Sequence, residues 1–186
     1  EVGENKKLTF ELPIPTHKEA IELVLRILTN DETKVINSIK EIQAIGHRVV
    51  HGGEFFKEST IVTKDVIEKI EQLIPLAPLH NPANIMGIKI CQELMPNIPN
   101  VTVFDTAFHQ TMTKENFLYA VPYADYTEHH LRKYGFHGTS HYYVSNETVK
   151  ILNKKDSKII VCHLGNGSSV CAVRDGKSIS TSIKLT

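Results

Sequence analysis

The strongest structural signal in this sequence is a pair of apolar stretches, each with a charged residue at or near its end. Residues 42–50 read as a buried strand that carries Arg48 near its end, and residues 100–104 read as a short strand that runs directly into Asp105. An acidic residue at the carboxyl end of a strand is where open α/β sheets hold ligands and metal-bound phosphates. Two plainer explanations stay open, because Arg48 could be exposed where its strand ends and Asp105 could cap the next turn.

Three helices are predicted in the first half of the chain from apolar residues at helical spacing. The first covers residues 17–29, behind a capping-box pattern made by Thr16 and Glu19. The second begins after the cap residue Thr63, and the third contains Pro82 in its first turn. These helices place the first half of the chain in the α/β class.

The second half is predicted to end in an antiparallel meander. Glycine-containing turns separate its apolar stretches, and such turns are typical of hairpins. Before it we expect a short strand and a helix. In order, the predicted segments are a strand at 118–121, a helix at 126–133, strands at 158–163 and 169–174 around the turn 165–167, and a third strand after the turn 175–176 that still continues at residue 186.

The stretch 134–141 reads Tyr-Gly-Phe-His-Gly-Thr-Ser-His and is predicted to be a loop that precedes a helix reaching about residue 152. Gly135 and Gly138 remove side-chain bulk where a backbone must turn or approach a ligand closely. The N-terminus of the following helix would offer free N–H groups to an anion. The stretch could equally be a helix start capped by Thr139 and Ser140.

Composition narrows the class of protein. Lys plus Arg and Asp plus Glu both number 21, so no basic field favours nucleic acid. The three cysteines lack zinc-type spacing and fit reduced thiols in a cytoplasmic protein, and no apolar stretch approaches the roughly 18 residues of a membrane span. The chain begins with Glu1 and ends in strand-like sequence, so we expect a fragment of a longer protein.

Several predicted loops carry groups suited to a phosphoryl group. A transferring phosphoryl group needs cationic or hydrogen-bonding partners, a carboxylate for a divalent metal, and backbone N–H groups around nucleotide phosphates. The chain supplies each kind, although it contains neither a Gly-x-x-x-x-Gly-Lys-Ser/Thr loop nor the protein-kinase signature. The residues concerned are Arg48, His80, Asp105, His137 and the turn 165–167.

Five segments together resemble the motifs of the acetate kinase family, in that family's order. They are residues 46–53, 77–84, 104–109, 134–141 and 163–169. The resemblance implies an α/β, two-domain fold of the actin-like type shared with sugar kinases and heat-shock ATPases (ribonuclease H-like), incomplete at both ends. It implies that residues 1–110 are part of an N-terminal acetate-binding domain. Residues 111–186 would then begin a second, nucleotide-binding domain.

The resemblance also implies roles for individual residues. Arg48 would bind the carboxylate of acetate or acetyl phosphate, and Asp105 would act through placement of Mg²⁺, the cofactor expected with ATP. His137 would stabilise the transition state, with His80 as a second phosphoryl-contacting histidine. Around the acetate methyl it places Val50, Leu79 and Phe136, and around the ATP phosphates His163, Leu164, Gly165, Asn166 and Gly167.

The implied reaction is reversible in-line transfer from ATP to acetate, giving acetyl phosphate and ADP. The expected partners are these small molecules and, for the full-length protein, a second copy in a homodimer; no nucleic acid and no membrane are expected. One departure lies near the end, where the family usually reads Asp-Thr-Ser-Met-Gly and this chain reads Ser180-Thr-Ser-Ile183-Lys184.

Other functions stay open at this level. The chain could be a non-catalytic fragment or a degenerate relative that binds nucleotide or a partner, and propionate or butyrate could replace acetate as substrate. A zinc site at His129, His130, His137 and His141 is not favoured, because no Glu follows His137 and no cysteine joins the group. His47, His51 and His109 are expected to pack or support loops.

Overall fold

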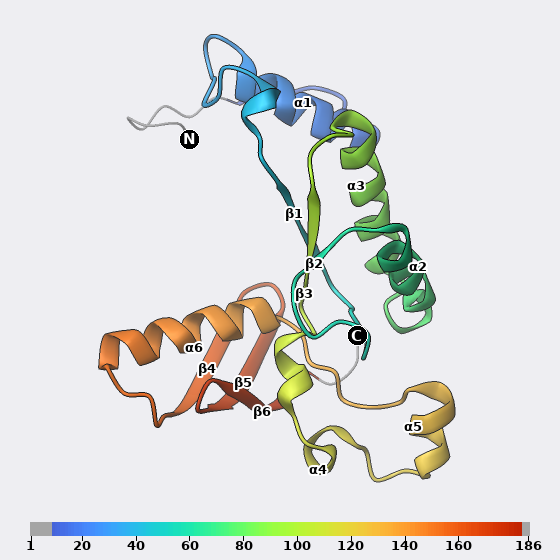
Figure 1. Cartoon of the computed structure of the whole chain (residues 1–186), viewed down its shortest axis with the longest axis vertical. Coiled ribbons are helices and arrows are strands. Elements are labelled where there is room, and N and C mark those ends of the chain that lie inside the picture. Colours follow the sequence, from blue (N-terminus) through green and yellow to red (C-terminus); the bar gives the residue numbers. More distant parts are fainter. Residues whose placement is uncertain (1–8, 184–186) are drawn as a thin grey trace.

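The part of the chain that the structure describes contains two three-stranded sheets, each with helices packed on it (Figure 1). The structure is a computed structural model that describes residues 9–183. The predictions for the strand end at 184–186 and for Lys184 therefore lie outside the described residues. No helix within residues 9–183 is long and apolar enough to cross a membrane.

The first sheet has the order β1-β3-β2 and brings together strands from different parts of the sequence. β1 (Ile45–Val49) and β3 (Asn100–Phe104) run parallel, with Val49 opposite Phe104, so both strands end at the same edge of the sheet. The short β2 (Thr60–Ile61) pairs antiparallel with β3. The predicted strand 100–104 is confirmed.

The predicted buried strand at 42–50 is only partly right. β1 begins at Ile45, and along it only Val49 is buried. Within the described sheet β1 is an edge strand, so an alternation of half-buried and exposed side chains replaces continuous burial. Its buried end packs with Phe104 in the core, beneath α2 (Lys64–Gln72) and α3 (Asn81–Leu94).

The three predicted helices of the first half are confirmed. α1 spans His17–Thr29, Thr63 caps α2 by accepting from the Val66 N–H at 3.3 Å, and Pro82 lies in the first turn of α3. Short 3₁₀ turns lie at Ile39–Glu41 (η1) and Ile74–Leu76 (η2). The capping box is wrong in detail, because the Thr16 hydroxyl donates to the Glu19 carboxylate and makes no cap bond to the helix backbone.

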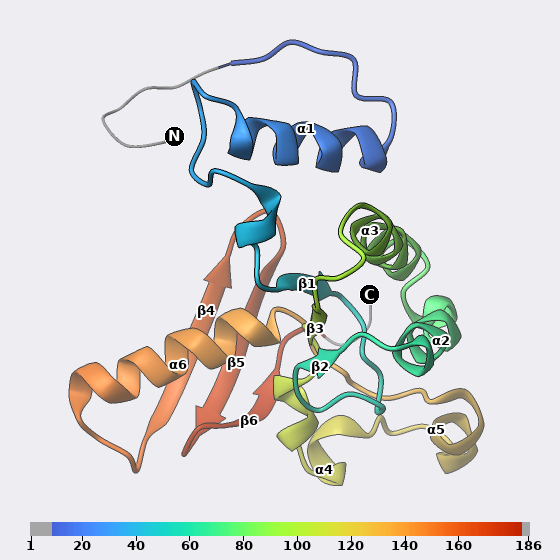
Figure 2. The ribbon, with the colours of Figure 1, turned by 45° about the horizontal axis from the view of Figure 1, so that its top comes forward.

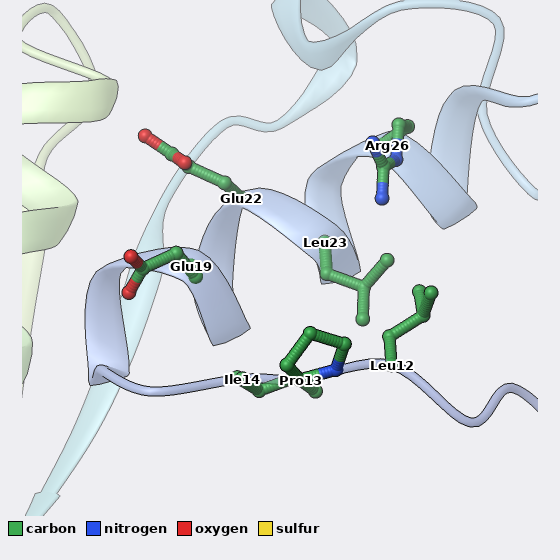
Figure 3. Close-up of a pocket in the computed structure, with 7 residues that line it drawn as sticks. All are labelled: Leu12, Pro13, Ile14, Glu19, Glu22, Leu23 and Arg26. Atoms are coloured by element: carbon green, nitrogen blue, oxygen red, sulfur yellow. The ribbon is translucent and has the colours of Figure 1, made fainter.

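α1 lies beyond α3 and away from both sheets (Figure 2). None of its 13 residues, all of them described, is buried. The extended segment before it runs alongside the helix, and a hollow of about 430 Å³ is lined by Leu12, Pro13, Ile14, Glu19, Glu22, Leu23 and Arg26 (Figure 3). This hollow contains none of the candidate site residues.

The second sheet is the predicted antiparallel meander. β4 (Lys158–Leu164), β5 (Ser168–Arg174) and β6 (Lys177–Thr181) pair in sequence order, and α6 (Gly138–Leu152) lies across one face (Figures 1 and 2). Asp175 and Gly176 have φ of 51° and 75°, the pair of positive values that a tight hairpin turn requires. The prediction of a hairpin turn at 175–176 is confirmed.

The connection between the sheets departs most from the predictions. It consists of η3 (Phe108–Thr111), α4 (Lys114–Phe117) and α5 (Tyr123–His129). The predicted strand at 118–121 is wrong, because no strand of the described chain pairs with these residues. The helix predicted at 126–133 starts earlier and ends at His129, since His130 adopts a left-handed conformation with φ of 52°. The proposed domain boundary at residue 110 stays a prediction.

Candidate active site

Arg48 and Asp105 form an ion pair where β1 and β3 end. The Asp105 N–H donates to the Val49 carbonyl at 3.0 Å and extends the parallel ladder by one residue. Arg48 donates from Nε to Oδ1 at 3.0 Å and from Nη2 to Oδ2 at 2.6 Å, a bidentate pairing that raises the pKa of Arg48. Asp105 is 1% exposed, whereas the Arg48 side chain is 64% exposed. A buried carboxylate thus orients an open guanidinium.

The start of α6 packs directly against Asp105. The Gly138 N–H donates to the Asp105 carbonyl at 2.9 Å, and a Cβ at Gly138 would lie only 2.2 Å from that oxygen. Any side chain at position 138 would clash, so this position requires glycine. The hydrogen bond joins the start of α6 to the end of β3. The predicted loop 134–141 is corrected: it ends at His137, which has φ of 58° and precedes the helix, and Gly138 through His141 form the first turn of α6.

His137 connects this helix start to the turn between β4 and β5. Its ring stacks on His163 at 4.1 Å between centroids, and its Nδ1 lies 2.9 Å from the Ser169 hydroxyl. A Cβ on Gly167 would approach its Cε1 and Nε2 to 3.3 Å. Burial lowers the pKa of His137, as do His163 and Arg48, while Asp105 acts in the opposite direction. His137 is therefore a neutral imidazole at neutral pH.

The expected ATP-phosphate turn is an open hairpin beside His137. Gly165, Asn166 and Gly167 are exposed, and the Gly165 N–H donates to the Gly167 carbonyl at 3.2 Å. Leu164 is 78% exposed and points away from the core of the second sheet. His163 is held from the other side, with Nδ1 at 2.9 Å from the Ser140 hydroxyl of α6. The turn and the helix start therefore lie next to each other around the two stacked histidines.

The N-terminus of α3 lies beside the end of β1. The Asn84 side chain accepts from the Val50 N–H at 3.1 Å, and Asn81 both accepts from and donates to the backbone of His51. His80 is the residue that immediately precedes α3, and its side chain makes no capping hydrogen bond to the helix. His80 is exposed.

The residues expected around a methyl group differ in exposure. Val50 and Phe136 are buried at 9% and 3% exposure, and the Phe136 ring lies 5.6 Å from that of His51. Leu79 is 86% exposed, so its side chain lies open at the surface near the α3 entrance. The structure thus buries Val50 and Phe136, the latter against His51, and leaves Leu79 open to solvent.

Three histidines outside the expected site residues are built into its support. His109, completely buried, has Nε2 at 3.0 Å from the Phe136 carbonyl and Nδ1 at 2.8 Å from the Ser178 hydroxyl. His141 Nε2 lies 2.7 Å from the Ser169 hydroxyl, and His51 packs edge-on against Tyr134 and Phe136. Burial lowers the pKa of each to about 4.

The sequence predicts packing roles for His51 and His109 but not their contacts with Phe136, and it predicts no role for Ser169. The sequence could have pointed to His141 and Ser169, because both lie inside motif segments that carry an expected site residue. A further missed group is Arg132, which is 3% exposed, donates to Glu54 at 2.7 Å and covers the Phe117 ring at 3.6 Å. Nothing in the local sequence distinguishes Arg132 from a surface arginine.

The carboxylate of Asp105 can still accept a metal ion. Within the described residues no three His, Cys, Asp or Glu side chains come close enough together to form a metal cage. Mg²⁺ seldom needs one, because it keeps several waters and binds through one or two carboxylates plus substrate phosphates. Each carboxylate oxygen has a second lone pair beyond the one used by Arg48, which is the chemistry that a Mg²⁺ ligand requires.

Known proteins similar to this chain include acetate kinases and a propionate kinase. The sequence model of the acetokinase family matches residues 1–186. The acetate kinase of Fusobacterium nucleatum is 60% identical over 186 residues, covering 100% of this chain and 47% of its own length. That of Thermotoga petrophila is 54% identical, covering 98% and 46%.

Solved structures agree with the sequence matches. Porphyromonas gingivalis acetate kinase superposes with a TM-score of 0.90 at 46% identity, covering 96% of this chain and 45% of that one. A Francisella tularensis propionate kinase gives a TM-score of 0.85 at 50% identity, covering 91% and 43%. The mixed α/β fold is therefore of the actin-like type, and the chain spans about half the length of the relatives it matches.

Proposed function

The chain belongs to the acetokinase family, and we propose that the protein containing it transfers a phosphoryl group between ATP and acetate, with acetyl phosphate and ADP as products. The observation that carries the proposal is the meeting of segments far apart in sequence. The Gly138-to-Asp105 hydrogen bond brings His137 to the Arg48–Asp105 pair, and the β4–β5 turn packs on His137. Because the chain covers 46% to 47% of its relatives, the activity is proposed for the whole protein.

Arg48 supports binding of the acid. A carboxylate is already ionised at neutral pH, so the reaction needs positioning and charge neutralisation more than a strong base. The planar guanidinium is held by Asp105 on one side and is open on the other, where it can pair with a carboxylate or an acyl phosphate. Val50 and Phe136, with the exposed Leu79, would receive the methyl group.

The position of His137 supports a role in stabilising the transferring phosphoryl group. Charge builds up on the equatorial oxygens of phosphorus during in-line transfer, and a preorganised N–H donor stabilises it there. The neutral His137 ring is held by Ser169 and His163, so it reorganises little during the reaction. We expect His80, the exposed residue before α3, to be a second contact of the same group.

The nucleotide is expected at the β4–β5 turn. Backbone N–H groups of a glycine-containing turn suit phosphates, and the turn from His163 to Gly167 is open to solvent beside His137. Bound Mg²⁺ would neutralise charge on the ATP phosphates, with Asp105 as the residue of this chain that would hold it. We expect the full-length protein to act in the cytoplasm as a homodimer. Sedimentation analysis of the purified protein would test the dimer.

The test is trapping of acetyl phosphate as hydroxamate by the complete protein with acetate, ATP and Mg²⁺. We expect turnover in the wild type and a loss of about 10²-fold or more in kcat for His137→Ala, with a smaller change in KM. A change confined to KM would remove His137 as the stabiliser. The 186-residue chain, assayed beside the complete protein, decides whether these residues alone are a catalytic unit or a non-catalytic module.

Propionate is the second candidate substrate. The propionate kinase structure supports it, since its sequence is 50% identical to this chain against 46% for the acetate kinase structure, although its TM-score is 0.85 against 0.90. One methylene in an apolar pocket discriminates by only about 1–3 kcal/mol. The ratio of kcat/KM for acetate and propionate, and for butyrate as a longer acid, decides between them.

A further inference from the structure

The hydroxyl of Ser169 lies between two histidine rings. Its Oγ is 2.9 Å from Nδ1 of His137 and 2.7 Å from Nε2 of His141. Ser169 and His141 are both buried, at 3% and 0% exposure, so water does not compete for these bonds. A serine hydroxyl carries one proton, and it can therefore donate to only one of the two rings.

The unpaired nitrogen of His141 decides the direction. His141 Nδ1 is buried and has no hydrogen-bond partner in the described part of the chain. If Ser169 donated to Nε2 of His141, the proton of that neutral ring would have to sit on Nδ1 as a buried N–H without an acceptor. Orphaned buried N–H donors are rarer in proteins than unsatisfied acceptors. Hence His141 donates from Nε2 to Ser169, and Ser169 donates to Nδ1 of His137.

We propose that Ser169 and His141 are positioning residues that hold His137 in the tautomer with its proton on Nε2. Because Nδ1 of His137 accepts from Ser169, the proton of the neutral ring must be on Nε2. Nε2 has no hydrogen-bond partner among the described residues, and Gly167 of the β4–β5 turn packs against it without a Cβ. The Nε2–H is therefore free to donate, and under the proposed function its acceptor would be the transferring phosphoryl group. The role in catalysis rests on the proposed function, whereas the tautomer does not.

A second histidine fixes the backbone that carries this ring. A carbonyl oxygen only accepts, so His109 donates from Nε2 to the Phe136 carbonyl and accepts at Nδ1 from Ser178. Cys171 Sγ lies 3.4 Å from the Ser178 hydroxyl on its other side. Buried neutral histidines thus hold both the main chain before His137 and its ring, and a ring held at two places keeps its N–H in one direction.

The first experiment reads the tautomer directly. The complete protein is labelled with ¹⁵N-histidine, and His137 is assigned from the signal lost in His137→Gln. A protonated and a bare imidazole nitrogen have well-separated ¹⁵N chemical shifts, so long-range ¹H–¹⁵N spectra identify the tautomer without any activity. We expect Nε2–H for His137 in the wild type and a tautomer mixture in Ser169→Ala. A proton on Nδ1 in the wild type, or an unchanged pure Nε2–H in Ser169→Ala, would overturn the proposal.

The second experiment separates positioning from folding. Gln at position 141 can place an amide N–H where His141 has its Nε2–H, whereas Ala cannot. We expect kcat to fall by about 10- to 100-fold in Ser169→Ala, less in His141→Ala, and little in His141→Gln, with KM changing less than kcat in each. Ser145→Ala removes another buried serine of α6 and is the matched control, which should keep kcat.

The two experiments fail separately. If the wild type made no acyl phosphate, the proposed function would be wrong while the tautomer measurement still tested the hydrogen-bond direction. If the wild type were active and Ser169→Ala retained both kcat and the pure tautomer, the function would stand and the positioning role would be refuted. Equal losses in His141→Gln and His141→Ala would also count against it.

Discussion

At the scale of single residues, the geometry of Arg48 matters as much as its charge. Its two donors occupy both oxygens of a buried carboxylate, and a lysine ammonium cannot reproduce this planar fork. We expect Arg48→Lys to lower kcat/KM for acetate and for acetyl phosphate by at least about tenfold, and Arg48→Ala by more. Steady-state kinetics of the complete protein measure this. Arg26→Lys, in exposed α1, is the control; an Arg48→Lys variant as active as that control would remove the fork from the mechanism.

The buried histidines make stability sensitive to acid. Burial lowers the pKa of His109 from its ordinary value of 6.5 to about 4 in the folded protein. Between these values the unfolded chain binds the proton and the folded chain does not, so the free energy of unfolding falls as the pH drops through this window. The loss is at most about 1.4 kcal/mol per pH unit for each such group, and it is absent above pH 6.5.

Denaturant unfolding of wild type and His109→Gln at several pH values tests this. The variant is expected to be less stable above pH 6.5, because Gln replaces only part of the hydrogen bonding to Phe136 and Ser178. Its stability should nevertheless depend less steeply on pH between about 6.5 and 4 than that of the wild type. Parallel pH profiles would mean that His109 takes up its proton equally in both states.

Single residues also show the limits of prediction from sequence. Arg48, Asp105 and His137 could be selected because their positions at strand ends and beside glycines are visible in the chain. The pairing of Arg48 with Asp105, the stacking of His137 on His163 and the burial of Arg132 could not. Each depends on partners between 26 and 78 residues away, whose approach is decided by the packing of both sheets.

At the scale of elements, the junction of β3 and α6 has no room for a side chain at Gly138. We expect Gly138→Ala to destabilise the protein by about 1–3 kcal/mol and to lower activity, because a methyl group 2.2 Å from the Asp105 carbonyl must push α6 away from β3. Gly87→Ala is the matched control. Gly87 lies within α3 with nothing within 4 Å of its missing Cβ, so alanine there should stabilise by about 0.5–1 kcal/mol.

Thermal unfolding of the two glycine variants measures both changes. Opposite signs of the change in Tm are expected, with a lower value for Gly138→Ala. If Gly138→Ala unfolded at the same temperature as the wild type, the contact between α6 and β3 would have to be looser than the 2.9 Å hydrogen bond indicates.

Elements with their own local signals could be predicted. Thr63 caps α2, Pro82 lies in the first turn of α3, and the β5–β6 turn has the residues that positive φ demands. Residues 118–121 have strand-like side chains but no neighbouring strand, and β1 was expected to be buried although its edge position leaves it half exposed. Pairing is a property of the sheet, and a single stretch of sequence does not contain it.

At the scale of the whole molecule, one face of the second sheet is apolar and open. Side chains alternate along β4 and β5, and α6 covers the face that carries Val161, Cys171 and Val173. The other face exposes Ile160 at 66%, Leu164 at 78% and Val170 at 39%, with the exposed Cys162 paired to Val170 between them. Contiguous apolar surface of this kind marks an interface. Since the relatives are about twice as long as this chain, we expect the rest of the protein to cover it.

The reaction rate of the Cys162 thiol measures whether this apolar face is covered. In the 186-residue chain its thiol is exposed, whereas Cys91 and Cys171 are buried and burial raises the pKa of both, which suppresses the reactive thiolate. We therefore expect one fast-reacting thiol per chain with an aromatic disulfide reagent, and a rate at Cys162 at least about tenfold lower in the complete protein, because a packed apolar face excludes the reagent. Cys162→Ser identifies the fast phase, and unfolding each sample in denaturant should expose all of its thiols. Equal rates at Cys162 in the native short and complete chains would show that this face meets solvent in both, and the part of the protein outside these residues would then have to pack elsewhere.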